Sequence, residues 1–124
     1  MQYMLLIYSD ESAQAAASPE EQNAVFQAYW QYGEWLNEKG WNAGGDPLRD
    51  TSHATVVRVR DGERIVTDGP FAETKEQLGG YYIVDVPNLD DAIEAAARCP
   101  GAEHGTMEVR PVLPMDELTG HNQG

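Results

Sequence analysis

The chain has 124 residues, of which 41% are apolar, and a formal net charge of −13, with only eight Lys and Arg residues. This length fits one domain, and the apolar share is enough for a hydrophobic core to which Trp30, Trp35 and Trp41 would contribute. The negative charge would repel phosphates, so the composition argues against partners such as nucleic acid or an anionic membrane surface. Cys99 is the only cysteine, which excludes an internal disulfide and is compatible with a reducing, cytoplasmic setting.

The N-terminal part predicts a strand, a loop and a long helix. Residues 2–9 are apolar on both faces, which is typical of a strand covered on both sides, and their run is too short to span a bilayer. Residues 10–18 are small and polar, and we expect a loop. The helix is expected to begin after Ser18 as its N-cap, with Pro19 at the first helical position. Glu21 would complete a capping box with Ser18, and Gly40 is the expected helix end. The predicted apolar face of this helix carries Val25, Phe26, Tyr29, Gly33 and Leu36.

A β-hairpin is predicted next, after a Gly/Pro-rich link at residues 43–53 that has room for a short strand. Residues 54–60 and 63–67 read as strands, and Asp61-Gly62 favours a type I′ turn between them. A two-residue loop fixes the register, so the expected pairs are Arg60 with Glu63, Arg58 with Ile65, Val57 with Val66 and Thr55 with Asp68. Asp68 would therefore end a strand face that is otherwise rich in valine.

The C-terminal part predicts a strand, a helix, another strand and a tail. Residues 79–86 and 107–113 have strand patterns, and Pro111 indicates an edge or strand-end position. Between them, Asn88 would cap a helix over residues 89–98. Its predicted buried stripe is Leu89, Ala92, Ile93, Ala96 and Ala97. Residues 1–114 would form a single domain, and residues 115–124 a flexible tail.

The predicted element order is β-α-β-β-β-α-β, which indicates an α+β fold of the ferredoxin-like split β-α-β type, with an antiparallel sheet and its helices on one face. Two helices cover only one face of a sheet, whereas the first strand is apolar on both. We therefore expect a homodimer that packs sheet face to sheet face.

Four stretches occur in a characteristic order: Asp68-Gly69-Pro70-Phe71, Lys75-Glu76, Gly79-Gly80-Tyr81 and Glu108-Val109-Arg110-Pro111. With the surrounding sequence from Met4 to Val112, this series resembles the DGPF-domain branch of the YCII-related superfamily. The resemblance implies a dimeric α+β barrel. It also implies a His–Asp active-site pair, of which only Asp68 can be placed, because residues 19–40 contain no histidine. Some members lie beside sigma-factor genes, which implies a regulatory context.

Asp68 is the main catalytic candidate. One interpretation is a turn residue that accepts backbone hydrogen bonds, and the other is a carboxylate at the mouth of a cavity, acting as a base or binding a cationic group. A partly buried Asp68 would need a partner, for which Arg58, Arg110 and Lys75 are the candidates. His53, at the start of the hairpin, is the best acid–base partner, although exposure to solvent is its default state.

Other side chains are candidates for ligand binding. Lys75 would either pair with Glu76 in solvent or reach an anionic ligand. Arg110 and Glu108 are predicted on the second side of the sheet, at a dimer or ligand contact, and one of Tyr81 and Tyr82 should face that side too. Phe71 would be a core plug or an interface anchor. The spacing of the histidines and of Cys99 indicates neither a metal site nor a cofactor motif.

Two functional hypotheses remain from the sequence. The first is a small-molecule-binding protein, with acid–base enzymatic activity centred on Asp68 and with Arg58, Arg110, Tyr82 and His53 as its partners. The alternative is a non-catalytic protein-interaction module in a regulatory, sigma-factor-associated setting.

Overall fold

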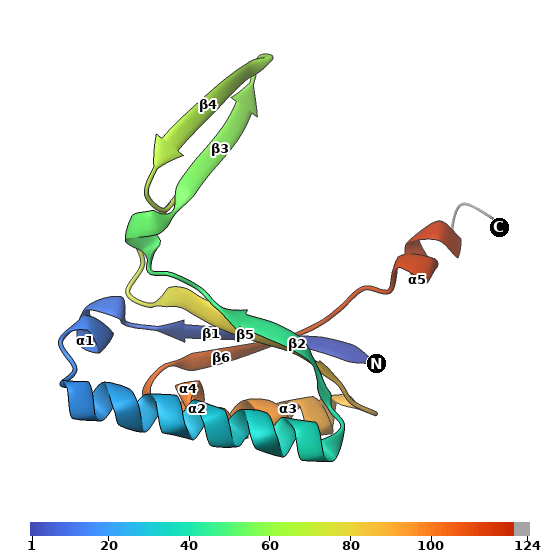
Figure 1. The fold of residues 1–124 in the computed structure, drawn as a ribbon. Coiled ribbons are helices and arrows are strands. Elements are labelled where there is room, and N and C mark those ends of the chain that lie inside the picture. Colours follow the sequence, from blue (N-terminus) through green and yellow to red (C-terminus); the bar gives the residue numbers. More distant parts are fainter. Residues whose placement is uncertain (121–124) are drawn as a thin grey trace.

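The computed structural model describes residues 1–120, and its main body is a four-stranded antiparallel sheet with order β2-β5-β1-β6 (Figure 1). In chain order the elements are β1 (Gln2–Ser9), α1 (Glu11–Ala15), α2 (Pro19–Lys39), β2 (Asn42–Pro47), the 3₁₀ helix η1 (Thr51–His53), β3 (Thr55–Arg60), β4 (Glu63–Asp68), β5 (Gln77–Asp85), α3 (Leu89–Arg98), α4 (Gly101–His104), β6 (Thr106–Pro111) and α5 (Met115–Gly120). Helices α2 and α3 lie on the same face of the sheet. The predicted ferredoxin-like α+β fold is confirmed.

The core lies between this sheet and helices α2 and α3. Along β1 the side chains alternate between buried and partly buried, so that Leu5 faces the helices and is fully buried. Leu36 of α2 and Val84 of β5 are also fully buried, and Cys99 packs beside them as a small apolar residue. The other face of β1, which carries Met4 and Leu6, is only partly buried within this chain.

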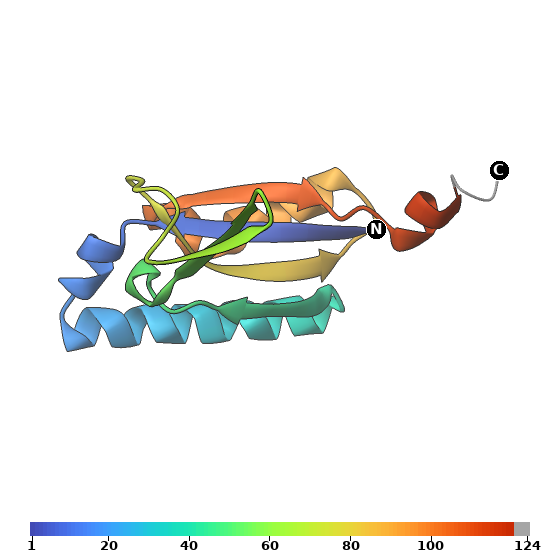
Figure 2. The same ribbon diagram turned by 90° about the horizontal axis from the view of Figure 1, so that it is seen from above.

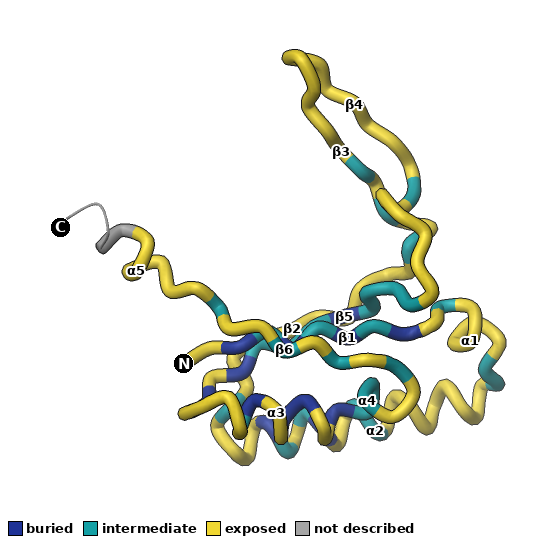
Figure 3. The backbone as a smooth tube through the Cα atoms, turned by 180° about the vertical axis from the view of Figure 1, so that it is seen from behind, coloured by how far each residue is buried: buried dark blue, intermediate teal, exposed yellow. Residues whose placement is uncertain are grey.

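The hairpin forms a separate two-stranded sheet that projects away from the body (Figure 1), and it overlies the main sheet in the view from above (Figure 2). The predicted register is confirmed, including the pair Thr55–Asp68. Neither strand of the hairpin can pair with β5 in the main sheet, because β1 and β2 already pair with its two edges. Thus the hairpin emerges from the connection between β2 and β5, and it stands on the side of the sheet opposite α2 and α3. Almost the whole hairpin is exposed, as are residues 115–118 of α5 (Figure 3).

The local signals at the helix ends are confirmed. Ser18 accepts a hydrogen bond from the backbone N–H of Glu21, whose carboxylate accepts one from the Ser18 N–H, and Gly40 ends α2 in a left-handed conformation. Asn88 caps α3 because its side-chain oxygen accepts a hydrogen bond from the backbone N–H of Asp91. Pro111 ends β6, which is an edge strand.

Some expectations about single elements were wrong. Residues 10–18 contain α1, because the Asp10 carboxylate accepts hydrogen bonds from the backbone N–H groups of Ser12 and Ala13 and so caps a short helix. Helix α3 ends at Arg98 as predicted, but the short helix α4, which begins at Gly101, was not predicted. Helix α5 lies within the segment predicted as a flexible tail, and residues 121–124 of that tail lie outside the described residues.

The apolar face of α2 is less buried than predicted. Trp30 is 61% exposed and Phe26 is 62% exposed, because only the C-terminal half of the helix packs on the sheet. Gly33 was also placed on this face, but an added Cβ there would meet no heavy atom of the described chain within 4 Å. On α3, Ile93 is 50% exposed and the buried stripe runs through Ala95 instead.

Candidate ligand pocket

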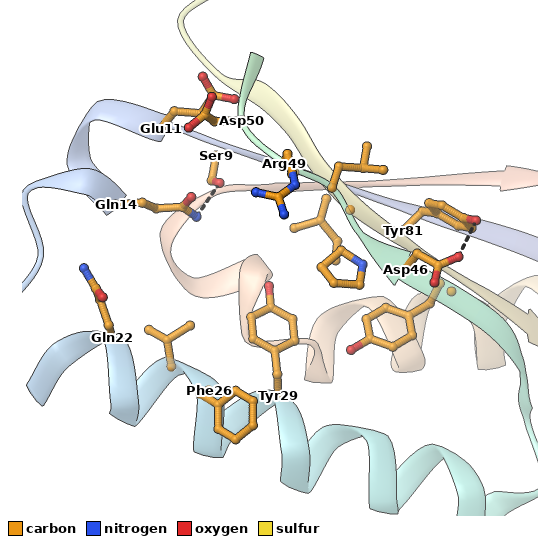
Figure 4. Close-up of a pocket in the computed structure, with 18 residues that line it drawn as sticks. Ser9, Glu11, Gln14, Gln22, Phe26, Tyr29, Asp46, Arg49, Asp50 and Tyr81 are labelled. Atoms are coloured by element: carbon orange, nitrogen blue, oxygen red, sulfur yellow. Dashed lines mark hydrogen bonds between the residues drawn. The ribbon is translucent and has the colours of Figure 1, made fainter. Parts of the chain in front are cut away.

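A cavity of about 500 Å³ opens between the N-terminal half of α2 and the β2–β5 side of the sheet (Figure 4). Its volume lies within the range of small-molecule sites, about 300–1,000 Å³. The cavity exists because α1 and the following loop separate β1 from the start of α2, which leaves that half of the helix away from the core. Its lining includes Ile7, Gln14, Val25, Phe26, Tyr29, Leu48, Arg49 and Tyr82.

The wall of the pocket is largely apolar and open to solvent. Val25 and Phe26 of α2 are 48% and 62% exposed, and Leu48, on the opposite side, is 46% exposed. Isolated apolar residues on a surface need no explanation, but these three line one concave site. An apolar ligand that binds there would displace water from this apolar surface.

A hydrogen-bond network holds the segment that carries Arg49. Glu11 accepts hydrogen bonds from the Thr51 backbone N–H at 2.8 Å and from the Thr51 hydroxyl at 2.7 Å, and its own N–H donates to Gln77 at 3.0 Å. Gln14 donates from its side-chain nitrogen to the Ser9 hydroxyl oxygen at 2.8 Å. Helix α1 therefore ties the 48–51 segment to the end of β1.

Each of the carboxylates near the pocket has a partner. Asp46 accepts a hydrogen bond from the Tyr81 hydroxyl at 3.0 Å, which raises the pKa of that phenol. Hydrogen bonds from the side chain and backbone of Ser52, and one with His53, lower the pKa of Asp50. Both oxygens of Glu11 are engaged by Thr51.

Arg49 differs from these carboxylates because its guanidinium has no acidic partner among the residues that the structure describes, within 4.0 Å. Figure 4 shows the side chain extending into the space between the sheet and α2, on the side to which the Tyr29 hydroxyl points. A guanidinium has five N–H donors in a planar fork that matches a carboxylate. The pocket thus combines one free cation with an apolar wall.

The floor of the pocket is electrically neutral. Burial raises the pKa of the Tyr29 phenol, and it raises the pKa of Tyr82 to about 12. Each of these groups therefore keeps its proton at neutral pH. They can form hydrogen bonds, but neither of them is available there as an anionic nucleophile or base.

Of the site residues predicted from the sequence, only Tyr82 lines this pocket. It faces α2, where its ring packs edge-on against Tyr32, so Tyr81 is the tyrosine that faces the other side of the sheet. Asp68 and Arg58 are exposed on the hairpin, where the strand alternation places them on opposite faces. The structure therefore does not bring Asp68 to the pocket or beside Arg58.

The remaining predicted residues lie apart from one another. His53 is exposed, with its Nδ1 at 3.3 Å from Asp50. Lys75 lies near enough to Asp10 to help lower the pKa of that carboxyl, whereas Glu76 accepts a hydrogen bond from Thr106. Glu108 is exposed on the open face of the sheet and accepts a hydrogen bond from Tyr8. Arg110 is also exposed on this face, where its charge acts on Tyr8. Phe71 is 80% exposed, so it is not a core plug.

The sequence analysis did not identify Arg49, Gln14 or Tyr29 as site residues. Arg49 follows Gly44-Gly45-Asp46-Pro47-Leu48, which reads as a link without chemistry. One available signal was that Arg49 is the only cation between Lys39 and Arg58 in an acidic chain. The positions of the other two residues in a pocket depend on contacts between distant segments.

Comparison with known proteins shows the family of the chain. The YCII-related domain matches residues 1–116. The chain belongs to the YCII-related family. An uncharacterised protein of Rhizobium meliloti (strain 1021) is similar to this family member, with 40% identity over 114 residues that cover 90% of this chain and 92% of that protein.

Residues 1–120 contain neither a candidate metal site nor a candidate membrane-spanning helix. Within this range, His, Cys, Asp and Glu side chains form no group of three or more that could hold a metal ion. No helix there combines the length and hydropathy needed to cross a bilayer.

Proposed function

We propose that this YCII-related protein is a homodimeric small-molecule-binding protein of the DGPF branch. The observation that carries the proposal is the pocket beside α2, where exposed apolar side chains surround a neutral floor and one unpaired guanidinium. Large apolar side chains in a concave site, together with a few polar groups, are the usual composition of a ligand pocket.

The dimer would use the sheet face opposite the pocket. Met4, Leu6 and Ile83 are apolar and only partly buried on that face, and the hairpin rises beside it. Val57, Val59 and Val66 lie on one face of the hairpin and are 56–62% exposed, so a second copy on the sheet would also cover apolar surface on the hairpin.

The charge distribution favours the same partner. Residues 55–68 contain three arginines and three acids, hence a net charge of 0, while the rest of the chain has five cations and 18 acids, hence −13. A neutral hairpin with three arginines can approach the acidic body of a second copy with less repulsion than two bodies would experience.

Acid–base activity at Asp68 would depend on the dimer, and it would not take place in the pocket beside α2. Asp68 is exposed at the end of β4, and the adjoining Phe71 has no cover within its own chain. Asp68 could act on a ligand only where a second copy, with Phe71 as an interface anchor, encloses it.

Binding is tested by thermal shift with a metabolite library, because a ligand specific for the folded state raises the melting temperature. Val25→Trp would fill the pocket from α2, whereas Ile93→Trp adds the same bulk to a β-branched position of α3 with 50% exposure, outside the pocket lining. We expect hits with the wild type and Ile93→Trp that disappear with Val25→Trp. Hits that Val25→Trp retains would contradict the assignment of the pocket.

The dimer has an independent test in sedimentation equilibrium. One chain has a mass of 13.7 kDa, so a dimer would give twice that value. We expect Val57→Asp to shift the mass toward the single chain, because the new carboxylate would have to be desolvated at the interface. A wild-type mass of one chain at micromolar concentration would refute the dimer.

The alternative proposal is a non-catalytic protein-interaction module. The exposed hairpin favours it, because an arm with valines on one face and three arginines could bind an acidic partner protein. A monomer in solution that binds no metabolite would favour this alternative.

A further inference from the structure

We infer that the pocket binds a small monocarboxylate with an apolar body, in which the carboxylate pairs with Arg49 and the body lies against Phe26, Val25 and Leu48. This inference rests on the proposed small-molecule function and adds the class of the ligand. It depends on Arg49, on the neighbouring acids and on the apolar wall.

Arg49 is the only cation in the pocket lining. Two other cations of the body have partners: Arg98 pairs with Glu94 at 2.8 Å, and Lys39 lies over the Trp41 ring at 5.3 Å. The exposed arginines of the hairpin also have no acid of the described residues within 4.0 Å, but they lie outside the pocket, whereas Arg49 lines it. Its fork is therefore free to accept a carboxylate in a bidentate pair.

The neighbouring acids do not occupy that fork. Glu11 and Asp50 accept hydrogen bonds that fix the 49–53 segment, and Asp46 is turned to Tyr81. These interactions keep three negative charges near the pocket without neutralising Arg49. A dianionic phosphate would be repelled by these acids and would have only one cation, so the site favours a single negative charge.

Two neutral groups could complete the recognition of the carboxylate. The Gln14 side-chain nitrogen carries two hydrogens, of which one is used in the bond to Ser9. The Tyr29 hydroxyl lines the same pocket and points to the side where Arg49 lies. Gln14 can donate its second hydrogen to an oxygen held by the guanidinium. The Tyr29 hydroxyl, which interacts with Cys99 and the Gly101 backbone, would have to turn its hydrogen toward the ligand, and neither group adds charge.

The apolar wall determines the rest of the ligand. Phe26 offers an aromatic face, and Val25 and Leu48 offer aliphatic surface, all with at least 46% exposure in the empty pocket. An aromatic or branched aliphatic group would cover these side chains. The preferred ligand therefore has one charged end and one apolar end.

The experiment compares charged and neutral probes of the same shape by isothermal titration calorimetry and ligand-observed NMR. The probes are phenylacetate and 3-phenylpropionate, each with its primary amide. We expect at least one carboxylate to bind the wild type at least tenfold more tightly than its amide, because the amide lacks the charge-assisted pair.

The variants separate charge from fold. Arg49→Gln should weaken carboxylate binding by about 10- to 100-fold and leave the amide little changed, and Arg49→Lys should restore part of the affinity, since it keeps the charge but loses the fork. Arg58→Gln is the matched control, because it removes the same charge from an exposed hairpin arginine outside the pocket lining. The melting temperature of Arg49→Gln should stay near that of the wild type, because no acidic partner is lost.

Three results would overturn the inference. If the amides bind the wild type as tightly as the carboxylates and Val25→Trp abolishes both, small-molecule binding stands and the carboxylate class is wrong. The same conclusion follows if Arg49→Gln and Arg58→Gln weaken carboxylate binding equally. If neither class of probe binds and the metabolite screen gives no hit, both the ligand class and the proposed function fail.

Discussion

Tyr32 makes the interaction whose energetic contribution can be isolated most cleanly. Its ring is 4% exposed, and its hydroxyl donates a 2.6 Å hydrogen bond to the Ala95 carbonyl in the last turn of α3. The N–H of Cys99, which would bond to Ala95 in a regular helix, bonds to Ala96 instead. The Tyr32 hydroxyl therefore joins α2 to a buried carbonyl at the end of α3.

Tyr32→Phe removes that hydroxyl and leaves the ring. Loss of the bond and an unsatisfied buried carbonyl should lower the free energy of unfolding by about 2 kcal/mol. For a chain of this size, such a loss corresponds to a fall of about 8 °C in the melting temperature. The measurement is urea and thermal unfolding followed by circular dichroism, at one fixed protein concentration so that any oligomer contributes equally.

Tyr3→Phe is the matched control. Tyr3 is also 4% exposed, but its hydroxyl contacts only the Met1 sulfur at 3.5 Å, which is a weak acceptor. We expect this variant to lose less than about 0.5 kcal/mol, since no strong hydrogen bond is broken. Equal unfolding midpoints for the two variants would refute the role assigned to the Tyr32–Ala95 bond.

Two further predictions concern the strand beside the pocket and the response to alkaline pH. Gly45→Ala should destabilise the protein by about 2 kcal/mol or more, because its φ is +147° and its Cβ would lie 2.5 Å from the Tyr81 carbonyl oxygen. Gly44→Ala is the control, because Gly44 has a φ of +137° but an added Cβ would meet no heavy atom within 4 Å, so only backbone strain of about 1 kcal/mol is expected. If urea unfolding showed equal losses of stability for the two variants, the close approach of the Gly45 Cβ to Tyr81 would not be the cause. Because burial raises the pKa of Tyr82 to about 12 from its ordinary 10.0, the stabilising effect of the neutral phenol is present below pH 10 and is lost as the pH rises toward 12. The decline in unfolding free energy between pH 10 and 12 should be smaller for Tyr82→Phe, and an unchanged decline would show that Tyr82 does not contribute to it.

The parts of the fold that the sequence predicted correctly depend on nearby residues. Ser18 and Glu21 begin α2 through two reciprocal hydrogen bonds, and Asp61-Gly62 sets the register of the whole hairpin. In both cases the interacting groups lie within a few residues of one another. The ferredoxin-like fold class followed from the order of the helices and strands along the chain.

The position of the hairpin depends on distant residues, which is why it was not foreseen. Strand β5 pairs with β1 and β2, so neither β3 nor β4 can join it. The capping of α1 by Asp10 has an equally remote effect, since this short helix holds the start of α2 away from the core. The pocket forms from this displacement, and no single segment of the sequence contains it.

The contrast between Asp68 and Arg49 has the same origin. Asp68 drew attention because a turn motif surrounds it and an apolar strand face precedes it, yet its face of the hairpin is uncovered in a single chain. Arg49 lies in a link without a motif, but α1, β5 and α2 enclose the space into which it extends. A charged side chain gains its chemistry from what surrounds it. In one chain those surroundings exist at Arg49, and at Asp68 they would have to come from a second copy.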